Sequence, residues 1–150
     1  MKKYELTAEF IEKWGKKLFR IKALISFGSV EAGELGGYVE KEDNLAQTGN
    51  AWVSGDARVY GDAEVYGDAR VCGDAWVSGD ADYLLIGRIG SRFSFTTFFK
   101  NKDKGITVSC GCFLGTIAEF RAKVTDTHGN NKHAKMYNLA ADMAELQILG

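Results

Sequence analysis

Small apolar and polar residues alternate along the middle of the chain in a repeat of six. Glycine recurs at every sixth position from Gly49 to Gly79, and the units read GNAWVS, GDARVY, GDAEVY, GDARVC, GDAWVS and GDADYL. In each unit an alanine stands two positions before a valine or, in the last unit, a tyrosine, so both side chains fall on one face of an extended strand. Gly-Asp is typical of turns. The pattern predicts short strands with an interior of alanine and valine and with Gly-Asp corners.

A period of six fits neither a helix nor the longer repeats of helical solenoids. It favours a left-handed parallel β-helix, in which three hexapeptides complete one triangular coil. Residues 18 positions apart would then be neighbours on adjacent coils, at about 4.8 Å. Trp52 is expected beside Arg70, and Arg58 beside Trp76. The segment GGYVEKEDNLAQT at 36–48 is interpreted as a degenerate first coil.

The segments on either side of the repeat predict two further parts. Residues 10–27 read FIEKWGKKLFRIKALISF, and the break at Trp14-Gly15 favours a β-hairpin. A helix from Thr7 to Lys17 is the alternative, because Phe10, Ile11 and Trp14 also have helical spacing. After the repeat, three apolar segments predict strands: YLLIGRIGS, RFSFTTFFK and ITVSCGC.

Two helices are expected at the end of the chain. Thr116 with Glu119 forms a capping box at the start of the first, and Gly129 suits its C-cap. Residues 131–149 predict a second, amphipathic helix. One face of it carries Met136, Leu139, Met143 and Leu146. The fold class is therefore mainly β: an N-terminal β cap at 1–36, a left-handed β-helix at 37–84 and a C-terminal α/β lobe with three strands and two helices at 85–150.

Several motifs resemble those of a known group of proteins. RIKAL, GELGGYVE and NLAQTGNAWV, which lie within residues 20–53, precede the GDAxVY array. Together they resemble the start of the left-handed β-helix, or polymer-forming hexapeptide-repeat, proteins of phages and prophages of gut bacteria. The segments IGSRFSFTTFF, GCFLGTIAEF and THGNNKHAKMY look like a tail domain found in some of them. The resemblance implies an architecture and names no reaction.

The distribution of charge makes the repeat a poor candidate for binding nucleic acid. The chain is 45% hydrophobic and 26% charged, with a net charge of −1. Residues 37–84 hold three basic and ten acidic side chains, and residues 85–150 hold nine basic and five acidic ones. Phosphate backbones require clustered Lys and Arg, so an anionic ligand is expected in the last part. No apolar run is long enough for a membrane span, we expect no signal sequence in the start MKKYELTAEF, and three cysteines are not expected to form a disulfide framework. A cytoplasmic location is expected.

Histidine and cysteine limit the chemistry. A γ-class carbonic anhydrase is excluded because residues 37–84 contain no histidine to bind zinc. A hexapeptide acyltransferase needs a histidine base, and only His128 and His133 exist. Cys110 and Cys112 would suit zinc or act as nucleophiles beside His128, but a C-x-C pair on a strand is interpreted as two free thiols. We expect no catalytic residue, no bound metal and no cofactor.

The segment GRIGSRFSFTT at 87–97 is the candidate binding site. It places cations and hydroxyls among glycines and phenylalanines, which is the chemistry of nucleotide recognition. The candidate ligand-binding residues are Arg88, Ser91, Arg92, Thr96, Thr97 and His128. Exposed aromatic residues are enriched at interfaces, and those expected in a homodimer or homotrimer are Trp52, Tyr60, Tyr66 and Trp76.

The sequence leaves three classes of function open. The first is a non-enzymatic binding protein that sequesters a nucleotide-type signal or blocks a host defence protein, a role suggested by the phage resemblance. The second is an enzyme, either a degenerate acyltransferase or a cysteine-dependent activity. The third is a purely structural oligomerisation module.

Overall fold

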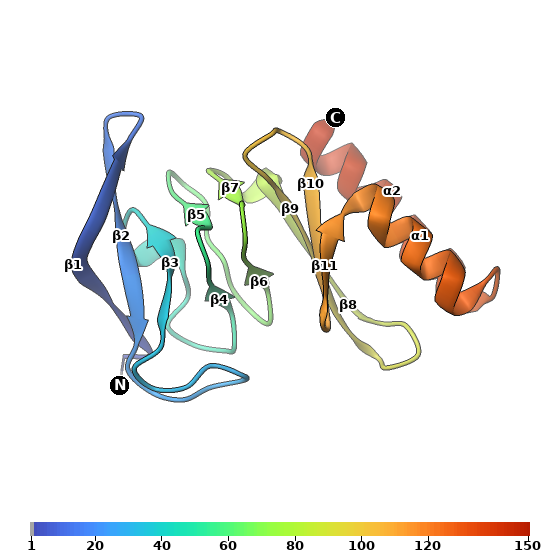
Figure 1. Cartoon of the computed structure of the whole chain (residues 1–150), viewed down its shortest axis with the longest axis horizontal. Coiled ribbons are helices and arrows are strands. Elements are labelled where there is room, and N and C mark those ends of the chain that lie inside the picture. The colour runs from blue at the N-terminus through green and yellow to red at the C-terminus, as the bar shows by residue number, and fades with distance from the viewer. Residues whose placement is uncertain (1) are drawn as a thin grey trace. The chain divides into compact units, whose positions relative to one another are not determined.

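The computed structural model describes residues 2–150 and divides the chain into two compact units (Figure 1). The first unit ends at Asp80, and the second runs from Ala81 to Gly150. The first contains short strands and one 3-10 helix (η1, Glu42–Asn44), and a second 3-10 helix (η2, Asp80–Asp82) lies at the boundary. Both α-helices belong to the second unit.

An antiparallel hairpin starts the first unit. β1 (Tyr4–Lys13) and β2 (Lys16–Ala23) pair from Tyr4↔Ala23 to Lys13↔Lys16. Trp14 and Gly15 connect them with φ of 53° and 74°, and two positive φ values are the signature of the tight turn that matches strand twist. The predicted hairpin is therefore confirmed, and the alternative helix is wrong.

The repeat forms strands of only two residues each. β3 (Leu35–Val39), β5 (Arg58–Val59) and β7 (Trp76–Val77) pair in parallel and continue the hairpin into one sheet of order β1-β2-β3-β5-β7. β4 (Trp52–Val53) and β6 (Arg70–Val71) form a second, separate parallel pair. The neighbours expected at a separation of 18 are confirmed, because Trp52 pairs with Arg70 and Arg58 with Trp76.

The left-handed β-helix is nevertheless wrong as the fold class. The five-stranded sheet is mixed, because β2 is antiparallel to both of its neighbours, β1 and β3, and the second unit has an antiparallel sheet. Within residues 2–150 no sheet is closed or forms a parallel solenoid. Two-residue strands build only short ladders, and the longer hairpin strands complete the sheet. The resemblance to phage hexapeptide-repeat proteins is corrected with it, since the architecture that it implied differs from the observed sheets.

The interior of the repeat follows the alternation in the sequence except in the last unit, where Ala81 was expected inside but is exposed. Five alanines (Ala51, Ala57, Ala63, Ala69 and Ala75) and five valines (Val53, Val59, Val65, Val71 and Val77) are all at most 1% exposed. Glycine turns the corners, and from Gly49 to Gly73 every repeat glycine has a φ between 63° and 74°. The sixth, Gly79, lacks the positive φ, so the regular geometry stops at the end of the first unit.

The second unit is a four-stranded antiparallel sheet covered by two helices. Its strands are β8 (Tyr83–Ile89), β9 (Ser94–Lys100), β10 (Ile106–Cys110) and β11 (Phe113–Thr116), in the order β11-β10-β9-β8. The fourth strand was not among the three predicted. α1 (Ile117–His128) begins at the predicted capping box and ends at Gly129, and α2 (Lys132–Leu149) follows after a short turn.

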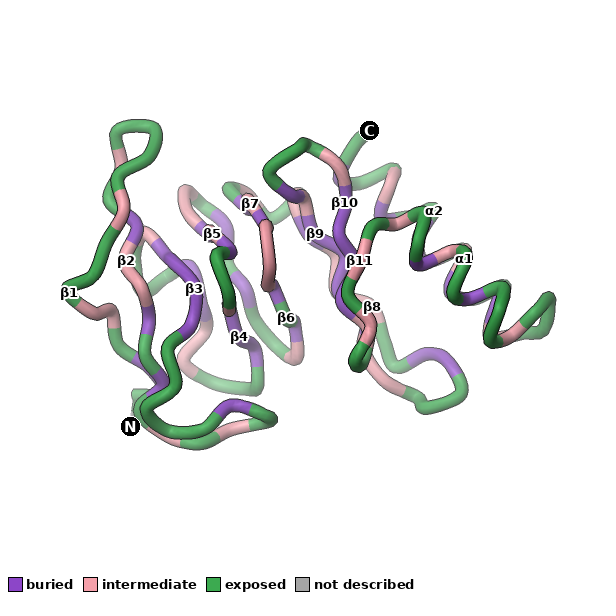
Figure 2. The backbone as a smooth tube through the Cα atoms, in the orientation of Figure 1, coloured by how far each residue is buried: buried purple, intermediate pink, exposed green. Residues whose placement is uncertain are grey.

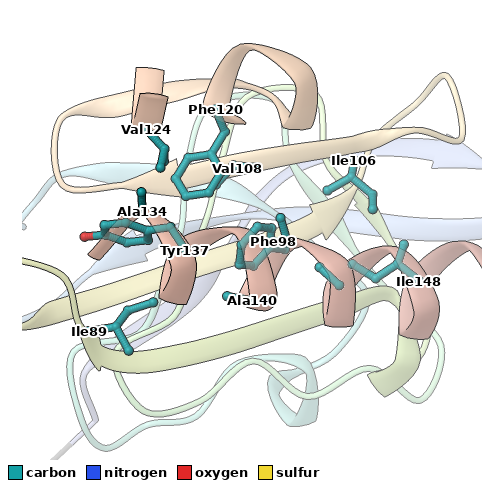
Figure 3. Close-up of a cluster of buried hydrophobic side chains, with 12 residues drawn as sticks. Ile89, Phe98, Ile106, Val108, Phe120, Val124, Ala134, Tyr137, Ala140 and Ile148 are labelled. Carbon is teal, nitrogen blue, oxygen red and sulfur yellow. The ribbon is translucent and has the colours of Figure 1, made fainter. Parts of the chain in front are cut away.

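Both helices contribute to one apolar cluster with the sheet (Figure 3). Phe98 and Val108 of the strands belong to this cluster with Phe120 of α1 and Tyr137 of α2, and Ile106 lies toward the other end of α2, where Ile148 is labelled. The buried side of α2 is made of Ala134, Tyr137, Ala140, Ala141, Ala144 and Ile148. In Figure 2, purple segments mark the buried positions along α1 and α2, and green segments mark the exposed ones. Small alanines let α2 lie close to the sheet, so the predicted face with Met136 and Leu139 lies exposed.

Candidate functional site

A cavity of about 340 Å³ opens on the second unit, where the sheet meets the two helices. Its cationic and imidazole side chains are Arg92, Lys123 and His128. Its hydroxyls come from Ser91, Ser94 and Thr127, its apolar walls from Phe113, Phe120, Val124 and Tyr137, and its sulfur atoms from Cys110 and Cys112. Of the described residues that line this cavity, none is an aspartate or glutamate, so it favours an anion.

Helix α1 supplies one wall because five of its residues share a face. Phe120, Lys123, Val124, Thr127 and His128 follow the i, i+3, i+4, i+7, i+8 spacing. Phe120 and Val124 are buried, while Lys123 and Thr127 are exposed and His128 is half-buried. The Thr116 hydroxyl accepts a hydrogen bond from the Glu119 N–H at 3.2 Å, which fixes where this face begins. The helix therefore has apolar groups inside the cavity and polar ones at its rim.

Tyr137 forms the polar part of the cavity interior. Burial raises the pKa of its phenol to about 12, the nearby Cys110 thiol acts in the same direction, and the Arg92 charge acts against it. The Thr96 hydroxyl donates a hydrogen bond to the Cys110 sulfur at 3.2 Å. A Cβ at Gly90 would overlap the Tyr137 hydroxyl. Because Gly90 has no side chain, the Tyr137 phenol has room at this position. Arg92 lies near the phenol.

The two histidines lie at the junction of α1 and α2. Their ring centroids are 5.4 Å apart, and His128 stacks on Tyr137 at 5.9 Å with an interplanar angle of 24°. The buried Nδ1 atom of His133 has no hydrogen-bond partner among the residues that the structure describes. Among residues 2–150 no three His, Cys, Asp or Glu side chains are grouped so that they could hold a metal ion.

The structure gathers half of the predicted ligand-binding residues. Ser91, Arg92 and His128 line the cavity. Thr96 is buried outside the lining and donates a hydrogen bond to the lining residue Cys110, while Thr97 is buried within β9. Arg88 is exposed and is not part of the lining.

Several lining residues were missed by sequence reasoning. Lys123 and Thr127 could have been found from Phe120, because they lie three and seven positions after it on the same helical face. Tyr137 had no such signal, since its position depends on how α2 packs on the sheet. Phe113 and Ser94 likewise enter the cavity only through strand pairing.

The aromatic residues predicted at an interface have different environments. Trp52 was expected to be exposed, but it is only 5% exposed and contacts the rings of Tyr4 and Phe27. Tyr60 and Trp76 are half-buried against Trp14, at centroid distances of 4.8 and 4.9 Å.

Tyr66 has the greatest exposure of the four predicted aromatics, at 57%. Three of them therefore contribute to packing within the first unit.

Comparisons with known proteins assign no family. A scan against protein-family models found no match to this chain, and a search of curated proteins found none either. Within residues 2–150, no helix has the length and apolar character needed to cross a membrane. The function is therefore argued from the cavity.

Proposed function

We propose that the second unit is a binding domain for a small anion that carries a flat ring, with a nucleotide as the chemical class. The observation that carries the proposal is the composition of the cavity: Arg92, Lys123 and His128 on its lining, aromatic walls, and no carboxylate among the lining residues. Cations and hydroxyls recognise phosphate, whereas aromatic faces stack on bases. A stoichiometric binder of this kind would sequester a nucleotide signal.

The size of the cavity supports a small ligand. A volume of about 340 Å³ lies at the lower end of the range for small-molecule sites, roughly 300 to 1,000 Å³. Phe113, Phe120 and Tyr137 offer ring faces or edges, and Ser91, Ser94 and Thr127 offer hydroxyl groups at its rim. We therefore expect a mononucleotide to fit better than a polymer.

Calorimetric titration with AMP, adenosine and inorganic phosphate tests the proposal. AMP should bind more tightly than either fragment, because it alone satisfies both the cations and the aromatic walls. A charge-assisted hydrogen bond contributes about 1.5 to 3 kcal/mol, so Arg92→Gln should weaken AMP binding roughly tenfold to a hundredfold.

Matched substitutions control for the general loss of charge. Arg88→Gln removes the same charge four residues away from Arg92 but outside the cavity lining, and Lys102→Gln is the corresponding control for Lys123→Gln. Both controls should bind AMP nearly as well as the parent protein. Failure of AMP and related mononucleotides to bind, or equal losses in the Arg92 and Arg88 variants, would contradict the proposal.

A cysteine-dependent reaction in the same cavity is the second candidate. The observation that favours it is the presence of Cys110, Cys112 and His128 together in one lining. Incubation with AMP followed by chromatography should then show a product that disappears in Cys110→Ser or Cys112→Ser. Recovery of unchanged AMP, with binding intact in both serine variants, would leave binding as the function.

A further inference from the structure

The outer side of α2 carries an apolar stripe, defined as Met136, Leu139, Met143 and Leu146. Their exposed fractions are 38%, 63%, 53% and 76%. The buried side of the same helix is lined mostly by alanine. A surface helix normally buries its leucines and exposes polar residues. The reversed arrangement indicates that the stripe is covered by a partner.

The spacing of the stripe indicates what kind of partner fits. Its residues are separated by three, four and three positions, which is the a/d pattern of a helix that packs lengthwise on another helix. The pattern extends at the same spacing to Lys132 before it and Gly150 after it. A partner helix of similar length with the same pattern would contact every residue of the stripe. α2 of a second copy meets that requirement.

Charge determines the direction of such a pair. The N-terminal half of α2 carries Lys132 and Lys135, and its C-terminal half carries Asp142 and Glu145. A parallel pair would place the two Lys132 side chains opposite each other, while an antiparallel pair places Lys132 at the C-terminal end of the partner helix, where its charge complements the helix dipole. Arg121 already pairs with both carboxylates, at 2.7 Å to Asp142, and so limits repulsion where the two acidic segments meet.

We propose that the protein forms a homodimer through an antiparallel pair of α2 helices. Met136 then packs against Leu146 of the second copy, and Leu139 packs against Met143. An apolar patch of this kind covers on the order of a few hundred Å², below the roughly 800 Å² that each partner of a standard interface contributes. We therefore expect a reversible dimer rather than a permanent one.

Sedimentation velocity over a concentration series tests the dimer. The parent protein should pass from monomer to dimer as its concentration rises. The double variant Leu139→Glu/Leu146→Glu should raise the dissociation constant of the dimer roughly tenfold or more, because it places charges within the apolar stripe. Leu114→Glu is the matched control, since Leu114 is 53% exposed on β11 and lies outside the stripe. Far-UV circular dichroism confirms that each variant is folded.

Two outcomes overturn the proposal. The first is a monomer at every concentration, as expected if the stripe binds a different protein. The second is a dimer that the Leu139→Glu/Leu146→Glu variant leaves intact.

Disulfide cross-linking tests the direction of the pair. Met136→Cys with Leu146→Cys should give an interchain disulfide that joins these two positions, identified by peptide mapping. Met136→Cys alone should not cross-link at this position, because ten residues of helix separate the two thiols by about 15 Å. Efficient cross-linking of the single variant would show a parallel pair and contradict the antiparallel one.

Discussion

Substitution of Gly36 by alanine should destabilise the first unit, because β3 passes β4 without room for a side chain. A Cβ at Gly36 would lie 2.5 Å from the Val53 carbonyl oxygen, 2.6 Å from Ile21 Cγ1 and 2.7 Å from Trp52 Cζ2. Ile21 is fully buried and Trp52 is 5% exposed, so neither side chain can move toward solvent. The added methyl group therefore overpacks the interior of the unit.

The magnitude follows from two opposing effects. Overpacking a core costs about 1 to 3 kcal/mol, and three contacts with rigid neighbours place this site at the upper end. Alanine also lowers the conformational entropy of the unfolded chain, and this offsets about 0.4 to 1 kcal/mol of the loss in stability. The net loss in the free energy of unfolding should be about 2 kcal/mol. For a unit of this size, that corresponds to a decrease in melting temperature of roughly 10 °C.

Tryptophan fluorescence during urea denaturation measures this effect selectively. Trp14, Trp52 and Trp76 are the three tryptophans of the chain, and all belong to the first unit. Gly79→Ala is the control, since an added Cβ there has no neighbour within 4 Å and the backbone has no positive φ. The control should be neutral or slightly stabilising. Equal midpoints for Gly36→Ala and Gly79→Ala would refute the close packing of β3 on β4.

Three further predictions concern other parts of the chain. Thr116→Ala should destabilise α1 by about 1 kcal/mol, measured by circular dichroism at 222 nm, and Thr116→Ser should restore it. Gly90→Ala, at a φ of 84°, should displace Tyr137 and abolish AMP binding while the fluorescence transition stays unchanged. Burial lowers the pKa of Lys3 to about 8 from an ordinary 10.5. Because the unfolded chain then binds more protons, urea midpoints of the first unit should rise from pH 8 to pH 10. A midpoint that falls over this range would contradict the burial of Lys3, and above pH 10 the raised pKa of Tyr4 opposes the rise.

The repeat shows where sequence reasoning succeeds and where it stops. Alternation alone identified the buried alanines and valines, since strand geometry puts every second side chain on one face. The separation of 18 residues also predicted the pairing of Trp52 with Arg70. The same pattern did not reveal that the hairpin joins β3 and makes the sheet mixed. Pairing between distant segments depends on tertiary packing, which a local period does not encode.

The candidate site was predictable only in part for a similar reason. Arg92 and His128 were singled out from separate segments, and the packing of α1 on the sheet brings them into one cavity. The orientation of α2 was misleading, because hydrophobicity favours burial of Leu139 whereas the alanines lie inside. Close approach of a helix to a sheet can favour small residues over large ones. A count of apolar positions cannot detect that preference.

The cavity and the stripe can be tested separately because they occupy different faces of α2. Tyr137 reaches the cavity from the buried face, whereas Leu139, two residues later, points from the exposed one. Substitution of Leu139 and Leu146 by glutamate should therefore leave AMP affinity unchanged, and Arg92→Gln should leave the dimer intact. If the first variant weakened AMP binding in proportion to dimer loss, the two faces would be energetically coupled through the helix. Independent losses would assign ligand binding and self-association to opposite sides of one element.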